Sequence, residues 1–279
     1  YINDIISSII HSSLYAFADD STLQAFAKDV STLIFRINED LKAISKYCQN
    51  NQLFLNVAKT KCLPINVSIS DLQDKIELNN SKIEVVGEFK LLGVHIDSKL
   101  SFSTHISKLV SKLSKASFIL SKIKIIIPDH YIEIIFNSLV MSHINYCLMI
   151  YLPACYKKDK LKLINKFIIN CLSNLNSQSR LKFDFDLNFT YQLFNFLFNQ
   201  ITYNSHFSNI IIINTSKYST RQKMIYTIHH LNQTKTKRAL HYWGPKLLNQ
   251  LPCQITEFKS ASQLKKFIST ANIRLDEIL

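Results

Sequence analysis

The spacing of apolar residues near the start of the chain predicts a β-hairpin followed by a long helix. Residues 14–17 are apolar and aromatic, a polar run interrupts them at residues 18–21, and the strand-like pattern resumes at residues 22–26. This pattern predicts a hairpin whose tip carries Asp19 and Asp20. A helix is then expected from about residue 32 to residue 50, with Ser31 as its N-cap. Its apolar stripe consists of Leu33, Ile37, Leu41, Ile44 and Cys48, and we assign it no chemistry.

Four short strand-like runs follow, at residues 61–67, 75–78, 82–86 and 89–96, with a turn expected at Asn79-Asn80. From about residue 103 the apolar residues recur at helical period. The first of these helices has an apolar face that includes Ile106, Leu109 and Leu113. Its opposite face carries Lys108, Lys112, Lys115 and Lys122.

Later elements are predicted with less regular patterns. A second helix is expected to begin near Asp129, after Pro128, and a third near Lys158. Residues 187–201 form an aromatic-rich, buried segment, residues 217–238 form a basic, solvated one, and Lys265-Lys266-Phe267 lies in a final helix. The sequence has only 3 glycines and 5 prolines, so the regular elements should be long. These patterns together predict an α+β protein: a hairpin, a packing helix and small antiparallel strands, followed by a mostly helical region.

The charge of the chain points to a polyanionic partner. The formal net charge is +13, and 47% of the residues are hydrophobic, which is enough for a buried core. The abundance of Ile, Asn and Lys leaves open that biased genome composition contributes to this charge. The 6 cysteines form no Cys-x-x-Cys pair, so we expect buried thiols in a reducing compartment and no zinc ribbon. Polar residues break the longest apolar stretches, so no membrane partner and no signal peptide are expected.

Two adjacent aspartates at a hairpin tip permit two interpretations. Aspartate favours turns, and this structural role is the more common one. Alternatively, the two carboxylates are hard oxygen ligands for Mg²⁺, and phosphoryl transfer uses two such ions about 4 Å apart. The second ion would require a further carboxylate from a facing strand.

Four ordered segments resemble the reverse transcriptases of non-LTR retrotransposons. Phe17-Ala18-Asp19-Asp20 is similar to their Tyr/Phe-Ala-Asp-Asp hairpin, and residues 1–4 are similar to the Tyr-Ile-Asn-Asp segment that precedes it. Residues 51–61 follow the pattern N-x-L-x-L-N-x-x-K-T-K, and residues 92–97 follow L-G-V-x-I-D, with His105-Ile106 beyond it. Looser similarity to the family's thumb and C-terminal segments extends over residues 136–147, 218–221 and 243–252.

The resemblance implies a partial polymerase palm at residues 1–100, a helical thumb at 101–175 and a basic C-terminal region at 176–279. It implies an RNA-directed DNA polymerase that uses an RNA template, a DNA primer, deoxynucleotides and two Mg²⁺ ions. It further implies a nuclear or cytoplasmic ribonucleoprotein. Asp19 and Asp20 would be catalytic metal ligands. Lys59 and Gly93 would contact nucleic acid, with Gly93 at the primer-grip turn. Independently of the resemblance, the charged helix face with Lys108, Lys112, Lys115 and Lys122 is a candidate nucleic-acid surface.

The family's first catalytic aspartate and its fingers precede the segment that matches residue 1, and the chain begins with Tyr1 in place of Met. We therefore expect a fragment that does not polymerise alone. Lys59 as a solvated lysine and Gly93 as a plain tight turn remain open alternatives. A non-catalytic nucleic-acid-binding remnant, or a protein adopted by the host, is the competing function. An unrelated basic helical protein is disfavoured by the four ordered motifs.

Overall fold

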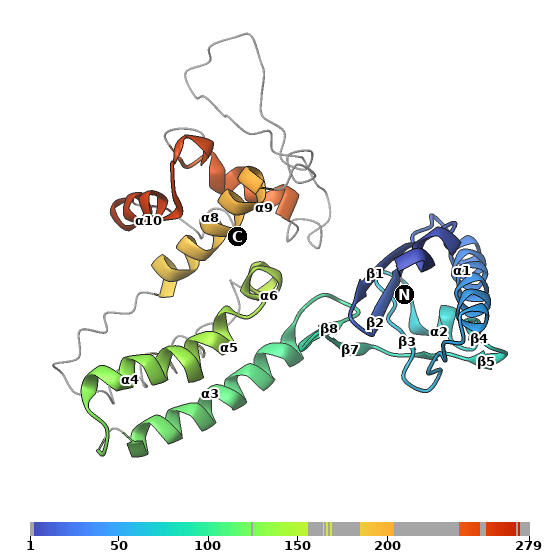
Figure 1. Ribbon diagram of the computed structural model, residues 1–279, viewed down its shortest axis with the longest axis horizontal. Helices are drawn as coiled ribbons and strands as arrows, with labels where there is room; N and C mark the ends of the chain where they lie inside the picture. Colours follow the sequence, from blue (N-terminus) through green and yellow to red (C-terminus); the bar gives the residue numbers. More distant parts are fainter. Residues whose placement is uncertain are drawn as a thin grey trace, which may run out of the picture. The chain divides into compact units, whose positions relative to one another are not determined.

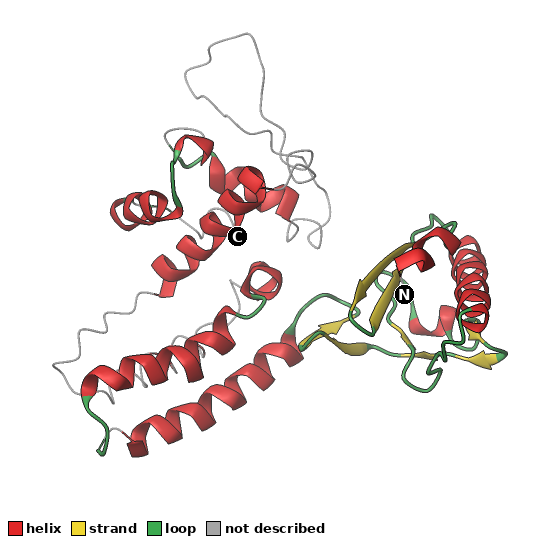
Figure 2. Ribbon diagram, in the orientation of Figure 1, coloured by secondary structure: helices red, strands yellow, loops and turns green. Residues whose placement is uncertain are grey.

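The computed structural model describes residues 3–123, 125–155, 164, 166, 168, 185–203, 240–251, 255–271 and 273. The chain divides into two compact units, residues 1–101 and 102–279, and each is described by itself (Figure 1). Helices predominate in the described residues, and the strands there form two-stranded sheets (Figure 2). The predicted α+β class is therefore confirmed.

Unit 1 begins with a 3-10 helix, η1 (Asn3–Ser8), then strands β1 (Ser13–Phe17) and β2 (Asp20–Gln24), then helix α1 (Val30–Asn50). The predicted hairpin is confirmed, with β1 and β2 antiparallel. The predicted cap of α1 is wrong. Asp29 caps the helix, and its carboxylate accepts the Thr32 backbone N–H at 2.7 Å and the Ser31 hydroxyl at 2.6 Å. Asp29 has the extended backbone of an N-cap residue, whereas Ser31 already lies in the first helical turn.

The core of unit 1 forms along the predicted stripe of α1. Leu41, Ile44 and Cys48 are buried, while Leu33 and Ile37 are half-buried. Two apolar clusters meet this stripe, one on each half of the helix. Their buried members beyond α1 are Ile5, Ile76, Leu78 and Ile83.

Four short strands follow α1, and they differ in part from the prediction. Strand β3 (Lys61–Cys62) pairs with β6 (Glu84–Val85) in parallel, where antiparallel pairing was expected. The run at residues 61–67 is a strand only at its start, because the chain turns into the short helix α2 (Ile69–Leu72). Strands β4 (Glu77–Leu78) and β5 (Ser81–Lys82) are antiparallel. The turn predicted between them is confirmed, since Asn79 and Asn80 have φ of 52° and 59°.

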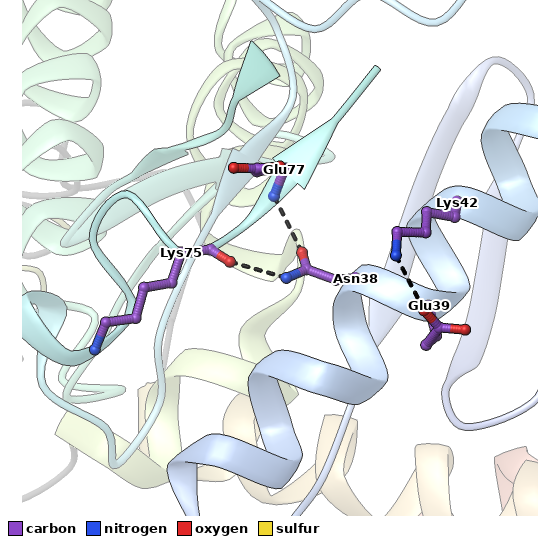
Figure 3. Close-up of polar contacts among 5 residues, drawn as sticks. All are labelled: Asn38, Glu39, Lys42, Lys75 and Glu77. Atoms are coloured by element: carbon purple, nitrogen blue, oxygen red, sulfur yellow. Dashed lines mark hydrogen bonds and ion pairs between the residues drawn. The ribbon is translucent and has the colours of Figure 1, made fainter. Parts of the chain in front are cut away.

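A side chain of α1 holds this small hairpin in place. The Asn38 amide donates to the Lys75 carbonyl at 2.9 Å and accepts the Glu77 backbone N–H at 3.1 Å (Figure 3). Both ends of the amide are thereby satisfied by one segment. On the same helix, Lys42 and Glu39 form an exposed ion pair at 3.2 Å, which Figure 3 also shows.

The run at residues 89–96 was predicted as one strand-like segment and is instead a third hairpin. Strand β7 (Glu88–Leu91) pairs antiparallel with β8 (Val94–Asp97) around a turn at Leu92-Gly93. The break is a consequence of Gly93, whose φ of 86° favours glycine.

Unit 2 opens with a helical hairpin. Helix α3 (Ser103–Ile123) lies beside α4 (Asp129–Phe136), which continues through a π-helical turn, η2 (Asn137–Met141), into α5 (Ser142–Asn145) (Figure 1). The start predicted for the second helix, after Pro128, is confirmed. Helix α6 (Leu148–Cys155) follows, and Tyr151 on it is fully buried. The apolar face predicted for α3 is also buried, as the exposed fractions of Ile106, Leu109 and Leu113 show.

The remaining described elements are α8 (Phe185–Tyr203), α9 (Leu240–Leu248), η4 (Ile255–Glu257) and α10 (Ala261–Thr270). The aromatic-rich segment is buried as expected at Phe194 and Phe198, and the predicted final helix is α10. The basic run at residues 217–238 and the predicted boundary near residue 175 lie outside the described residues, as does most of the helix predicted near Lys158. In the part of the chain that the structure describes, every helix is too short or too polar to cross a bilayer.

Candidate functional site

Asp19 and Asp20, together called the acidic tip, lie at the end of the β1–β2 hairpin. Phe17 and Asp20 are the last paired residues, so Ala18 and Asp19 form a two-residue turn. Ala18 has a φ of 53°, a conformation that two-residue turns usually assign to glycine or asparagine. An alanine in this left-handed backbone conformation lowers the folding stability by about 1 kcal/mol. The tip is therefore tightly turned, and both carboxylates are exposed.

The two faces of the hairpin have different environments. Leu14 and Leu23 face each other across the strands and pack into the core against α1. Tyr15 and Phe17 lie on the other face and are exposed. Because directly paired residues share a face, Asp20 lies on the exposed side with Phe17.

A buried carboxylate that the sequence analysis did not single out anchors the start of this hairpin. Asp40, on α1, has an exposed fraction of 0%. It accepts the backbone N–H of Ile10 at 2.9 Å and that of His11 at 3.2 Å to each oxygen. Only Ser12 separates these two residues from the start of β1. From Ser13 to Phe17 the strand spans roughly 14 Å, which brings the chain to the acidic tip.

The environment of Asp40 keeps it ionised. Burial alone would raise the pKa of this carboxyl, but the Ser12 side chain and the backbone N–H groups of Ile10 and His11 together lower it below its ordinary value. A buried charge on an otherwise apolar helix face is a departure from the helical pattern, and that departure was the available signal. The apolar positions of α1 predict its buried stripe, but they do not identify Asp40.

The acidic tip has the chemistry of a hard-cation site but few ligands. Carboxylate oxygens suit Mg²⁺, and Asp19 and Asp20 are adjacent on a tight turn. Among the described residues, no group of three or more His, Cys, Asp or Glu side chains could hold a metal ion. The donor type thus fits Mg²⁺, whereas the described ligand set is smaller than two ions require.

Lys59 lies in a compact loop before β3. The Asn56 carbonyl and side-chain oxygen both accept its backbone N–H, at 3.2 and 3.1 Å, and the Thr60 hydroxyl donates to the Asn56 carbonyl at 2.9 Å. The backbone of this loop is thereby fixed, and the Lys59 side chain is exposed. Two residues further on, the Lys61 ammonium forms an ion pair with the Glu84 carboxylate across the β3–β6 pair.

Gly93 is the second turn residue of the β7–β8 hairpin. Its positive φ and that of Leu92, 44°, account for a glycine at this position without any ligand. Gly93 therefore lies in a tight turn, as both interpretations of this glycine expect, and its contact with a primer strand stays a prediction. Close by in the chain, Asp97 closes the corner after β8, where its carboxylate accepts the backbone N–H of Lys99 and Ser101.

The four predicted lysines of unit 2 lie on one exposed face of α3. Lys108, Lys112, Lys115 and Lys122, called the lysine stripe, have exposed side chains. The helix residue His105 is buried instead, with its ring centroid 4.9 Å from that of Tyr151. Tyr151 in turn donates its hydroxyl to the Ile144 carbonyl at 2.5 Å. His105 thus packs against Tyr151 of α6.

The predicted site residues therefore fall into separate groups. The acidic tip, Lys59 and Gly93 are in unit 1, and the lysine stripe is in unit 2. Comparisons with protein-family models, with curated proteins and with solved structures found no match for this chain.

Proposed function

We propose that this chain is part of an RNA-directed DNA polymerase related to the reverse transcriptases of non-LTR retrotransposons. The observation that carries the proposal is a two-residue hairpin turn with adjacent, exposed carboxylates, Asp19 and Asp20. The segments that resemble the family surround this hairpin in the family's order. In this proposal residues 1–100 are the palm, residues 101–175 the thumb and residues 176–279 a basic C-terminal region.

The chain's own residues then have distinct roles in polymerisation. Asp19 and Asp20 hold Mg²⁺, which lowers the cost of developing negative charge during nucleotidyl transfer. Asp40 keeps the strand that leads to them in register. Lys59 lies in a fixed loop and its exposed ammonium group binds phosphate. Gly93 has no side chain, so the β7–β8 turn can approach the primer strand closely. The lysine stripe binds the phosphate backbone of the nucleic acid.

A second function is favoured by one observation. The described residues bring no third carboxylate together with the acidic tip, while the lysine stripe is exposed. A protein that binds nucleic acid as a ribonucleoprotein component, in the nucleus or the cytoplasm, without polymerising, would have these properties. In that case the acidic tip would serve only as a turn.

Mn²⁺ titration of this chain tests the metal assignment directly. Bound Mn²⁺ should broaden the amide NMR signals of Asp19 and Asp20, and Mg²⁺ should reverse the broadening. Asp19→Asn should abolish the effect, while the exposed control Asp74→Asn should retain it, because Asp74 is engaged by Lys82 at 3.5 Å. Uniform broadening across the chain would contradict a site at the tip.

Primer extension tests the activity. The longest reading frame that contains these residues should extend a DNA primer on an RNA template with Mg²⁺ and deoxynucleotides, and Asp19→Ala should stop it. Template binding without extension, in a protein that retains both carboxylates and gives the Mn²⁺ signal, would favour the non-catalytic function.

A further inference from the structure

An exposed aromatic residue lies at the edge of the lysine stripe. Phe118, on α3 between Lys115 and Lys122, has an exposed fraction of 64%. The Lys122 ammonium lies 5.6 Å from the centre of its ring. An exposed ring on a packed helix is available to a partner, since most of the opposite face of α3 is buried.

The geometry of an α-helix places this ring beside the lysines. At about 100° per residue, the four lysines fall within an arc of roughly 80°, and Phe118 lies roughly 40° beyond Lys122. Along the axis, Phe118 is about 4.5 Å from the level of Lys115 and about 6 Å from that of Lys122. The ring therefore has a cationic side chain before it and another after it along the same face.

The charges on α3 are not compensated within the helix. Its sequence, residues 103–123, contains no Asp or Glu. Within the described part of the chain, Lys112, Lys115 and Lys122 form no ion pair. Like charges three or four residues apart destabilise a helix, so an anionic partner would relieve this repulsion. Charge complementarity thus selects a polyanion as the occupant of this face.

We propose that α3 binds a single-stranded nucleic acid, with one base stacked on Phe118 and the flanking phosphates held by Lys115 and Lys122. The inference rests on the part of the proposed function that assigns nucleic acid to the lysine stripe. It adds that the bound nucleic acid is single-stranded. Exposed aromatic rings combined with basic side chains are the usual elements of single-strand binding, because every base has a face to stack. In a duplex those faces are covered by neighbouring bases, and only the phosphates remain for the lysines.

Binding requires one local rearrangement. The Lys122 ammonium, now near the ring of Phe118, moves to a phosphate when a base takes its place. The lysine stem is flexible and exposed, so this movement disturbs no packed side chain. The buried face of α3, including Leu113 and Leu120, keeps the backbone of the helix fixed meanwhile.

Fluorescence anisotropy with the full chain tests this inference. A labelled single strand should bind more tightly than its duplex of equal length at the same salt concentration. Phe118→Leu should weaken single-strand binding by about tenfold and change duplex binding by less than about twofold. Phe118→Tyr should retain the binding, because it keeps the ring. DNA and RNA strands of the same sequence show whether the sugar matters.

A matched control uses another exposed phenylalanine. Phe54, in unit 1, has an exposed fraction of 98% and no lysine stripe beside it, so Phe54→Leu should leave binding unchanged. Circular dichroism of each variant checks that the helices are intact.

Three results would overturn the inference: tighter binding of the duplex, equal weakening of both partners by Phe118→Leu, or binding to anionic lipid vesicles in preference to nucleic acid. None of them removes the Mn²⁺ signal at the acidic tip, so a failure here is distinguishable from a failure of the polymerase proposal. Conversely, loss of that signal leaves single-strand binding untouched.

Discussion

The acidic tip of unit 1 and the lysine stripe of unit 2 differ in how their side chains are held. The tip lies at the end of a two-stranded hairpin with one face exposed, and its anchor, Asp40, lies on a helix that follows the hairpin in sequence. The lysine stripe lies on a single helix whose opposite face is buried along its length. The positions of the lysines follow from helical period alone.

This difference predicts how substitutions should affect each region. A site at the end of a hairpin depends on a few specific contacts, so one substitution at a distance should disturb it. A stripe on a packed helix is a sum of separate charges, so each substitution should remove its own share. The following predictions test this contrast.

The largest effect is expected from Asp19→Ala in a polymerase that contains these residues. Loss of a metal ligand should reduce primer extension at least a thousandfold, or about 4 kcal/mol in activation free energy. Template affinity should stay within about twofold, since metal ligation serves the chemistry. Single-turnover extension and anisotropy on the same protein measure the two quantities. A parallel loss of both would show that the tip contributes to binding.

Asp40→Asn should reveal the dependence of the tip on a distant contact. The substitution removes the buried charge and leaves one acceptor for two backbone N–H groups, which should cost about 2 kcal/mol of local stability. Amide hydrogen exchange should accelerate at Ile10 and His11 and along β1. The β7–β8 hairpin is an internal control in the same unit, and its protection should not change.

Acidification should reproduce part of that effect in the unmodified protein. The folded-state pKa of Asp40 is lowered, so its stabilising contribution is complete above the ordinary aspartate pKa of about 3.9 and is lost as the pH falls through the folded value. Asp29 acts with the same sign, because the Ser31 hydroxyl and the Thr32 backbone N–H lower its pKa to about 2. The hydrogen-exchange protection factors in unit 1, which are corrected for the intrinsic pH dependence of exchange, should therefore fall progressively below about pH 4. Asp40→Asn should flatten this profile, and an unchanged slope would contradict the role of Asp40.

Replacing two members of the lysine stripe should have an additive, salt-dependent effect. Lys112→Gln with Lys115→Gln should reduce the slope of log affinity against log salt by about 1.5 to 2, with about tenfold weaker binding at moderate salt. Each single variant should give about half of this change in the slope. Lys42→Gln is the matched control, because Lys42 is exposed but is engaged by Glu39 on α1. A slope that does not change would show that the stripe makes no phosphate contacts.

The smallest effect is expected at the turn itself. Ala18→Gly should stabilise the β1–β2 hairpin by about 0.5 kcal/mol, because glycine relieves the positive φ while its unfolded state has more entropy. Ala16→Gly, within β1, should destabilise the same hairpin by a similar amount. Hydrogen exchange of the strand amides measures both, and equal signs would contradict the strain at Ala18.

The sequence by itself determined the α+β class, the hairpin with its acidic tip, the Asn79-Asn80 turn and the faces of α1 and α3. These features depend on local period and on turn chemistry, which a sequence displays directly. It did not determine the cap of α1, where Asp29 and Ser31 are both good capping residues only two positions apart. Nor did it determine the division of residues 89–96 into two strands at Leu92-Gly93.

Only the tertiary structure decided which polar residues are buried and what they hold. In the sequence Asp40 and Glu39 are two adjacent acidic residues with nothing to distinguish them. In the structure Glu39 forms an exposed ion pair with Lys42, whereas Asp40 accepts hydrogen bonds from residues about thirty positions earlier. The parallel β3–β6 pair and the packing of His105 on Tyr151 are likewise contacts between distant segments. The physical reason is common to all three. Period fixes which side of an element a residue occupies, whereas its partner depends on which other element the folded chain brings to that side.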